Sequence, residues 1–252
     1  MTIRPGVELG NLTDTGNHRT ENEDYYCYAE PANEDAFRVK GRLAVIADGM
    51  GGHEGGQEAS HLAVERVRDV YLAHSGTDPG EALVAAFGEA QGAIQNYALE
   101  HPELDGMGTT CTAAVIKDHQ LYFGHVGDSR LYLIREGSIS LVTEDHSYVH
   151  QLVRRGLITQ DEAAVHPERN VLTAALGMSM PVSADFAPQP IPLQPGDVLV
   201  LCTDGLHGLV TDQELLTMAS NDRPGQACHQ LVELAKLRGG FDNITVQILR
   251  IL

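Results

Sequence analysis

Acidic residues stand where several short apolar runs begin or end. The stretches "VIADGMGG" (45–52) and "LCTDGLHG" (201–208) share one design: an apolar run, Asp-Gly, an apolar residue and another glycine. "HVGDSR" (125–130), "FDNITVQI" (241–248) and "ENEDYYCY" (21–28) each place an acid beside a further apolar run. A single Asp-Gly is typical of a tight turn. The repeated pattern predicts a set of carboxylates at strand ends, namely Glu23, Asp24, Asp48, Asp128, Asp204 and Asp242.

Carboxylates that converge on one edge of a sheet repel one another unless a cation lies between them. Oxygen ligands without Cys or paired His indicate a hard divalent ion, Mg²⁺ or Mn²⁺, rather than zinc. One carboxylate bridging two such ions about 4 Å apart is an arrangement used to hydrolyse phosphoesters. Gly49, directly after Asp48, would also leave its carbonyl oxygen open to a metal. The pattern therefore predicts a metal-dependent hydrolytic site.

Three other kinds of site fit the sequence poorly. A dinucleotide-binding loop counted from Gly49 needs a third glycine where Glu54 stands, and Asp48 would face the pyrophosphate. The loop also lacks the Gly-Lys-Ser/Thr ending of a P-loop. Ser129, in "GDSRL", is not in the Gly-x-Ser-x-Gly turn of a serine hydrolase.

Composition narrows the class of protein. The 252 residues are 42% apolar, which is enough for one globular domain with a sizeable core. Lys and Arg total 17 against 35 Asp and Glu, and the formal charge of −18 opposes binding to nucleic acid or an anionic membrane. The sequence contains neither a signal-peptide core nor an apolar run of about 20 residues, so we expect a cytoplasmic protein. Four cysteines are predicted to be reduced core thiols: Cys27, Cys111, Cys202 and Cys228.

Short runs rich in Val, Ile, Tyr and Thr, joined by brief turns, favour antiparallel hairpins. They cover residues 7–12, 24–30, 42–48, 110–118, 121–126, 130–136, 198–204 and 243–251. Helical periodicity marks 58–72, and a second helix begins after Asp78, with Glu81 completing a capping box. A third helix runs from Pro224 to the stop "RGG" at 238–240.

This order of elements predicts a layered α+β fold rather than a parallel βαβ repeat. Residues 145–170 break the strand rhythm with short helical pieces and indicate a flap over one face. Because no Ser/Gly linker or low-complexity tract interrupts the chain, we expect a single catalytic domain over 1–252, with a flap subdomain at about 145–170.

Taken in order, these segments resemble the metal-dependent Ser/Thr protein phosphatases of the protein phosphatase 2C family, bacterial type. The resemblance covers essentially the whole chain, and its ordered set of motifs is highly specific although each is weak alone. The family implies a central sandwich of two antiparallel β-sheets flanked by α-helices, in α-β-β-α layers, with the metals in a cleft at one end. The motifs are "TDTGNHRTENED" (13–24), "VIADGMGGHEGG" (45–56), "GTTCTAAVI" (108–116), "HVGDSRLYLI" (125–134), "LCTDGL" (201–206) and "GGFDNITVQIL" (239–249).

The resemblance implies a role for each site residue. Asp48 should bridge two core Mn²⁺ or Mg²⁺ ions, and Gly49 should contribute its carbonyl oxygen. Arg19 should grip the substrate phosphate with its bidentate fork, the alternative being a surface ion pair with a neighbouring acid. The remaining ligands are Asp204 and Asp242 for the first ion, Glu23 and Asp24 for the second, directly or through water, and Asp128 for a third, weaker ion.

The implied mechanism is direct attack on phosphorus by a water that bridges the metals, with Arg19 and the ions stabilising the charge of the transition state. Animal relatives place a His directly after Asp-Gly as the proton donor, whereas this chain, like the bacterial subgroup, has Met50. The general acid is therefore open among His53, His166 and metal-bound water.

The resulting hypothesis is a phosphatase acting on phosphoserine and phosphothreonine in intracellular proteins, in opposition to bacterial Ser/Thr kinases. We expect a monomer whose partners are phosphorylated proteins, the kinases and their targets. Two rivals stay open: a catalytically silent phosphoprotein-binding module and a metal-dependent hydrolase of small phosphoesters.

Overall fold

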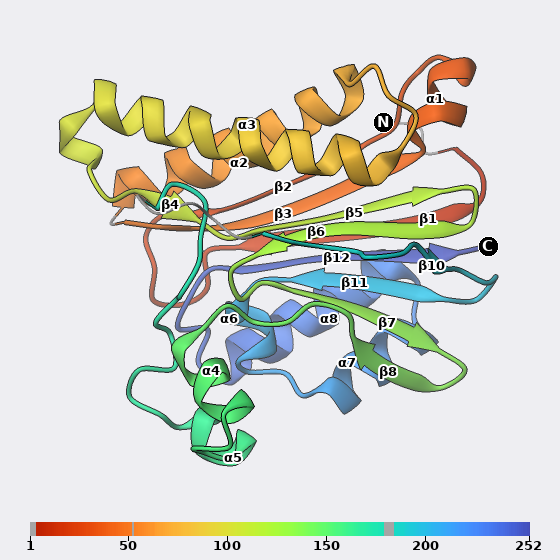
Figure 1. Cartoon of the computed structure of the whole chain (residues 1–252). Helices are drawn as coiled ribbons and strands as arrows, with labels where there is room; N and C mark the ends of the chain where they lie inside the picture. Colours follow the sequence, from red (N-terminus) through yellow and green to blue (C-terminus); the bar gives the residue numbers. More distant parts are fainter. Residues whose placement is uncertain (1–3, 52, 179–183) are drawn as a thin grey trace.

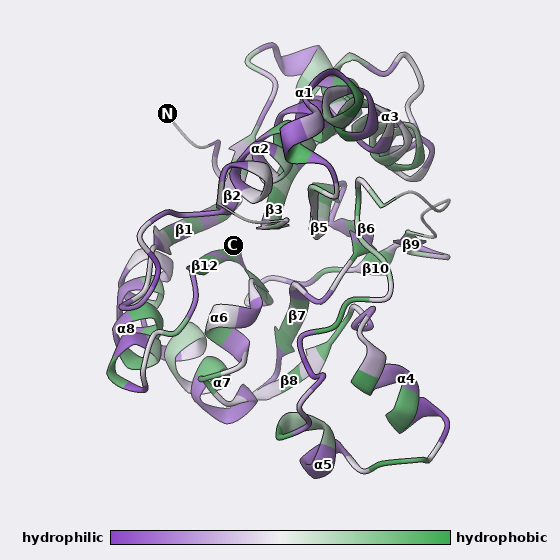
Figure 2. Ribbon diagram, turned by 90° about the vertical axis from the view of Figure 1, so that its left-hand side faces the viewer, coloured by the Kyte–Doolittle hydropathy of each residue, from purple (hydrophilic) through white to green (hydrophobic). Residues whose placement is uncertain are grey.

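The computed structural model describes residues 4–51, 53–178 and 184–252, with the main chain alone for His53. Two antiparallel sheets pack face to face, and helices cover the outer face of each (Figures 1 and 2). Within the described residues, one sheet has seven strands: β10 (Ile191–Pro192), β6 (Gln120–Val126), β5 (Cys111–Lys117), β3 (Arg42–Met50) and β2 (Asp24–Ala29) in spatial order, with β4 (Gly108–Thr109) on β3 and β9 (Asp185–Phe186) on β6. The other has five: β1 (Val7–Asp14), β12 (Ile244–Ile251), β11 (Val198–Cys202), β7 (Arg130–Arg135) and β8 (Ser138–Leu141).

The helices form the two outer layers. The seven-stranded sheet is covered by α2 (His53–Ala73) and α3 (Pro79–Glu100), and the five-stranded sheet by α6 (Asp204–His207), α7 (Asp212–Asn221) and α8 (Pro224–Leu237) (Figure 1). A short α1 (Glu34–Lys40) joins β2 to β3, and a 3₁₀ turn, η1 (Pro102–Leu104), follows α3. The flap carries α4 (Tyr148–Arg154) and α5 (Gln160–Ala164), which lie beside one end of the sandwich (Figures 1 and 2). The predicted α-β-β-α layering is confirmed.

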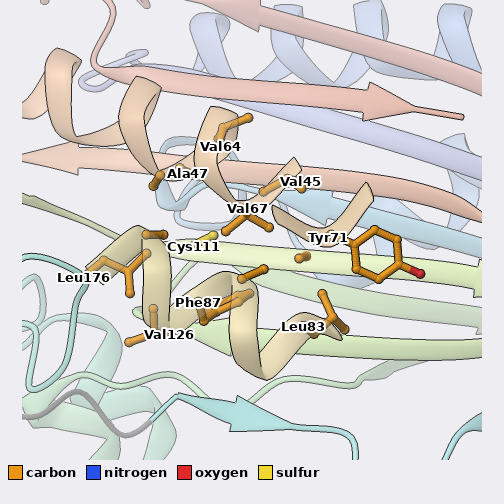
Figure 3. Close-up of a cluster of buried hydrophobic side chains, with 14 of the residues drawn as sticks. Val45, Ala47, Val64, Val67, Tyr71, Leu83, Phe87, Cys111, Val126 and Leu176 are labelled. Carbon is orange, nitrogen blue, oxygen red and sulfur yellow. The ribbon is translucent and has the colours of Figure 1, made fainter. Parts of the chain in front are cut away.

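Strand β3 explains why its sequence is a continuous apolar run. Leu43, Val45 and Ala47 belong to the cluster between the seven-stranded sheet and its helices, part of which Figure 3 shows. The alternate residues Ala44 and Ile46 pack against the five-stranded sheet. Successive side chains of a strand point to opposite faces, so a strand buried on both faces must be apolar throughout. The strand is therefore a rigid support for the residues that follow it.

The strands predicted from sequence are present, with ends shifted by a few residues. The first long helix begins at His53 rather than at 58, and helix α8 ends just before the predicted "RGG" stop. At the start of α3, the Asp78 carboxylate accepts a hydrogen bond of 3.0 Å from the Glu81 backbone N–H, which is half of the predicted capping box.

The cysteines are free thiols; Cys111, Cys202 and Cys228 are buried and Cys27 is half-buried. Burial raises the pKa of the Cys202 and Cys228 thiols to about 12, so neither is an activated nucleophile. Across the described residues, no helix is both long enough and apolar enough to cross a membrane.

Candidate active site

The ladder register brings the predicted acids to one end of the sandwich. Asp24, the first residue of β2, lies directly opposite Asp48 near the end of β3. Asp204 follows β11, Asp242 precedes β12, and these two strands are antiparallel neighbours. Asp128 lies in the turn between β6 and β7. This is the left-hand end in Figure 1 and the end that faces the viewer in Figure 2. Strand pairing within each sheet, together with the face-to-face packing of the two sheets, therefore brings together residues that are far apart in the sequence.

These acids border a cavity of about 370 Å³. Seven of the predicted site residues line this cavity, together with several neutral neighbours. Its described lining consists of Arg19, Glu23, Asp48, Gly49, Met50, Gly51, Thr110, Asp128, Asn170, Leu172, Asp204 and Asp242. Asp24 is the one predicted metal acid that the described lining lacks; it lies behind Asp48, with 5% of its surface exposed.

The carboxylates of the cluster raise one another's pKa values, which favours neutralisation of their charge by protons or by a cation. Burial, followed by the charges of Asp24 and Asp204, raises the pKa of Asp48 well above its usual range. Burial and the charge of Asp204 do the same for Asp128. The pKa of Asp204 is raised by burial and by Asp242. A bound cation would offset the same repulsion and keep the carboxylates ionised.

Two buried carboxylate oxygens have no hydrogen-bond partner, Asp24 Oδ1 and Asp204 Oδ1. The other oxygen of Asp24 accepts hydrogen bonds from the hydroxyls of Thr203 (2.9 Å) and Thr245 (2.6 Å), yet burial still raises the pKa of Asp24 to about 7. Unpartnered anionic oxygens in a set made only of oxygen donors fit a hard divalent cation. No three His, Cys, Asp or Glu side chains in the described part of the chain are gathered tightly enough to enclose an ion as they stand.

Arg19 lies at the rim of the cavity. Its Nη2 is 2.8 Å from Asp242 Oδ2, and the two side chains are 43% and 33% exposed. The sequence left two roles open for Arg19, phosphate binding and an ion pair with a neighbouring acid. The structure is compatible with both, because Arg19 lines the cavity and also pairs with Asp242. The pairing aims the guanidinium at the cavity that the carboxylates surround.

Gly49 is required by packing as well as by its position after Asp48. A Cβ at residue 49 would lie 2.0 Å from the carbonyl oxygen of Gly56, in the first turns of α2. A Cβ on Gly56 would in turn lie 2.6 Å from the Glu23 carboxylate. The Gly49 N–H donates to the Glu23 carbonyl oxygen at 3.1 Å. The two glycines therefore let β3, α2 and Glu23 meet beside the cavity.

Sequence reasoning missed the neutral residues that hold the acids. Asp48 is fixed through its backbone: its N–H donates to the Thr110 hydroxyl, its carbonyl oxygen accepts from the Thr110 N–H and the Thr109 hydroxyl, and each distance is 2.9 Å. His207 Nε2 lies 2.9 Å from the carbonyl oxygen of Asp128. Burial lowers the pKa of His207 to about 4, so the neutral ring donates this bond. The motifs contain these residues, but only the fold shows what they contact.

The structure bears differently on the two histidines that were predicted as proton donors. The side chain of His53 lies outside the described residues. His166, in the flap, accepts a hydrogen bond on Nδ1 from the Glu168 N–H at 3.1 Å and is not part of the cavity lining. Met50 does line the cavity, and no histidine is among its described neighbours there.

A family model described as protein phosphatase 2C matches residues 28–233. The chain belongs to this family. Protein phosphatase PhpP of Streptococcus pneumoniae is 33% identical over 257 residues, which cover 96% of each chain. The resemblance inferred from the motifs is confirmed.

Solved structures of family members match the fold closely. The Streptococcus agalactiae serine/threonine phosphatase superposes with a TM-score of 0.88 at 32% identity, covering 98% of this chain and 100% of that one. The catalytic domain of the phosphatase PstP, in complex with two manganese ions, gives a TM-score of 0.85 at 32% identity, with 98% and 99% of the chains covered. The sandwich fold expected from the resemblance is therefore that of known protein phosphatases.

Proposed function

We propose that this chain is a metal-dependent protein phosphatase that hydrolyses phosphoserine and phosphothreonine in bacterial proteins. The observation that carries the proposal is the convergence of five carboxylates, one of them with an unpartnered buried oxygen, on a cavity with an arginine at its rim. The serine/threonine phosphatase names of its relatives and the two manganese ions of PstP support the same activity and cofactor.

Two core ions, Mn²⁺ or Mg²⁺, and a third, weaker one fit the ligands that surround the cavity. When bound, such ions would activate a water as nucleophile and neutralise charge on the phosphate. We propose that Asp48 and the Gly49 carbonyl oxygen would hold both core ions, that Asp204 and Asp242 would bind the first, and that Glu23 and Asp24 would support the second, directly or through water. Asp128 would bind the third ion, and all of these residues except Asp24 line the cavity.

The protein's own side chains contribute to the reaction through their charges and by positioning the substrate. Without cations the carboxylate cavity repels an anionic phosphate, so we infer that substrate binds after the ions. Arg19 then binds a phosphate oxygen with the N–H groups that Asp242 does not occupy. For protonation of the leaving oxygen, His53 and a metal-bound water stay as candidates, because His166 is not part of the cavity lining. Loss of turnover on phenyl phosphate in His53→Ala, with no loss in His166→Ala, would assign the role to His53, and no loss in either variant would exclude both histidines.

The first test is phosphate release from a phosphothreonine peptide by the purified chain, with Mn²⁺ and then with EDTA. We expect release with Mn²⁺ and none with EDTA. Tight peptide binding without release in excess Mn²⁺ would instead identify a silent phosphoprotein-binding module. A higher kcat/KM on free phosphorylated metabolites than on a phosphoprotein would identify a hydrolase of small phosphoesters.

Asp204→Asn tests the metal assignment. The substitution preserves shape but removes one anionic ligand, so we expect turnover to fall by about a hundredfold or more with an unchanged circular dichroism spectrum. Asp118→Asn is the matched control, because Asp118 is an exposed acid in the turn between β5 and β6, at the opposite end of the sandwich. Full activity in Asp204→Asn would overturn the assignment.

We further propose that the chain acts as a monomer and that its substrates are proteins phosphorylated by bacterial Ser/Thr kinases. Sedimentation of the purified chain tests the first statement. The second is tested by treating proteins phosphorylated by such a kinase and measuring loss of phosphate.

A further inference from the structure

An exposed aromatic pair lies beside the candidate active site. The rings of His18 and Phe241 are in contact in a tilted arrangement, with centroids 5.1 Å apart and an interplanar angle of 30°. Phe241 is 61% exposed and His18 is also exposed. A large apolar side chain held in water is informative when it adjoins a functional cavity.

The two rings are adjacent in the sequence to residues of the candidate active site. His18 directly precedes Arg19, and Phe241 directly precedes Asp242. Arg19 and Asp242 are the ion pair at the rim of the cavity, so the two rings flank that rim from two different loops. One loop connects β1 to β2, and the other connects α8 to β12.

The two loops are locked together. The Asn17 N–H donates to the Gly240 carbonyl oxygen at 2.7 Å, and the Asn17 side-chain amide donates to the carbonyl oxygens of Lys236 (2.8 Å) and Gly239 (3.0 Å). Gly239 has a φ of +130°, and a Cβ there would lie 2.4 Å from the ring of Phe241. The ring thus rests on glycine backbone and keeps its other surface open. Such a preorganised apolar surface loses little side-chain entropy when a ligand covers it.

We propose that His18 and Phe241 form a subsite for an uncharged aliphatic or aromatic side chain of the substrate, one or two residues from the phosphorylated residue. This inference rests on the proposed function. Consecutive Cα atoms are about 3.8 Å apart, so a peptide whose phosphate is held at Arg19 brings its next residues to rings one position from Arg19 and from Asp242. Asp242, the carboxylate next to Phe241 in the sequence, is paired with Arg19 and is therefore not free to favour a basic side chain.

The test compares substrates that differ only at this subsite. Phosphothreonine peptides carry Leu, Gly or Lys at the flanking positions, and N-acetyl-phosphothreonine methylamide serves as the substrate without neighbours. For the wild-type chain we expect kcat/KM to be about tenfold higher with Leu than with Gly or Lys, as burial of one aliphatic side chain permits. Phe241→Ala and His18→Ala should reduce this Leu-to-Gly ratio toward one.

Leu252→Ala is the matched control, because Leu252 is 56% exposed and follows the far end of the strand that Phe241 precedes. It should keep the wild-type ratio. Phe241→Leu, which keeps an apolar surface, should retain part of the preference and guards against a folding defect in Phe241→Ala.

The outcomes separate this inference from the proposed function. Equal losses on the Leu peptide, the Gly peptide and the blocked single residue would mean that Phe241 only supports Asp242, and would overturn the subsite. A preference for Lys, or a Leu preference unchanged in both alanine variants, would overturn it as well. If the wild-type chain releases no phosphate from any of these substrates, the proposed function fails and the subsite fails with it.

Discussion

At the scale of single residues, the acids of the site are placed by neutral side chains. Thr110 lies between β4 and β5, where the ladder beside β3 is interrupted. Its hydroxyl replaces a main-chain acceptor for the Asp48 N–H and also lies 2.8 Å from the Ser129 hydroxyl. If Asp48 bridges two ions, as proposed, its position tolerates little displacement, so we assign the hydroxyl a positioning role.

Thr110→Val removes that hydroxyl and keeps the shape of the side chain. The Asp48 N–H would be buried without an acceptor, which costs about 1 to 3 kcal/mol of folding free energy. We expect a lower melting temperature and a kcat reduced by about tenfold, since a shift of the bridging acid disturbs every ion it contacts. Thr110→Ser retains the hydroxyl and should stay near the wild type. A Val variant with normal kcat would show that the hydroxyl does not position Asp48.

At the scale of elements, the sequence predicted what periodicity and burial determine. The β-rich sandwich, helices α2, α3 and α8 and the clustering of strand-end acids follow from apolar patterns and from antiparallel pairing. Helix α7 was not predicted, although Thr211 and Glu214 form a complete capping box at its start. The contacts of Thr110 and His207 could not be predicted, because no sequence pattern identifies which residue a hydroxyl or an imidazole will contact. Their partners lie 62 and 79 residues away in the sequence.

The junction of β3 and α2 gives a prediction at this scale. In Gly49→Ala the new methyl group meets the Gly56 carbonyl oxygen, so strand and helix must separate. We expect lower stability and loss of activity together, because Asp48 and Glu23 flank the junction. Gly88→Ala, in the middle of α3 with no atom within 4 Å of the new Cβ, should instead raise stability by about 0.5 to 1 kcal/mol. Thermal unfolding and phosphate release on both variants measure the contrast; equal stability in the two would contradict the packing argument.

At the scale of the whole molecule, five of the carboxylates that contribute to the formal charge of −18 line a single cavity at one end of the sandwich. Arg19 pairs with Asp242, and repulsion among the other carboxylates is an electrostatic strain that the packing of the two sheets must offset. The same repulsion between carboxylates would favour the binding of a cation among them. Stability and cofactor binding are therefore linked through protonation of these acids.

The linkage has a definite sign. Burial raises the folded-state pKa of Asp24 from 3.8 to about 7 and raises that of Asp48 well above its usual range, so between roughly pH 4 and 7 these acids bind more protons in the metal-free folded chain than in the unfolded chain. The contribution of these acids to stability is therefore highest below that window and falls as pH rises through it. We expect the melting temperature in EDTA to drop between about pH 5 and pH 8, by about 2 to 4 °C for each kcal/mol lost.

Calorimetry with and without Mn²⁺ tests this linkage. Mn²⁺ should raise the melting temperature most at about pH 8, where the ligands are ionised and the strain it relieves is largest. Asp24→Asn should flatten the pH dependence in EDTA, because it removes one raised titration. Asp118→Asn removes the same charge from an exposed turn and should leave the slope unchanged, which separates the buried acids from the general effect of net charge. We infer that the acids at the strand ends lower the stability of the fold until a cation binds. Equal slopes of melting temperature against pH in the two variants would contradict this inference.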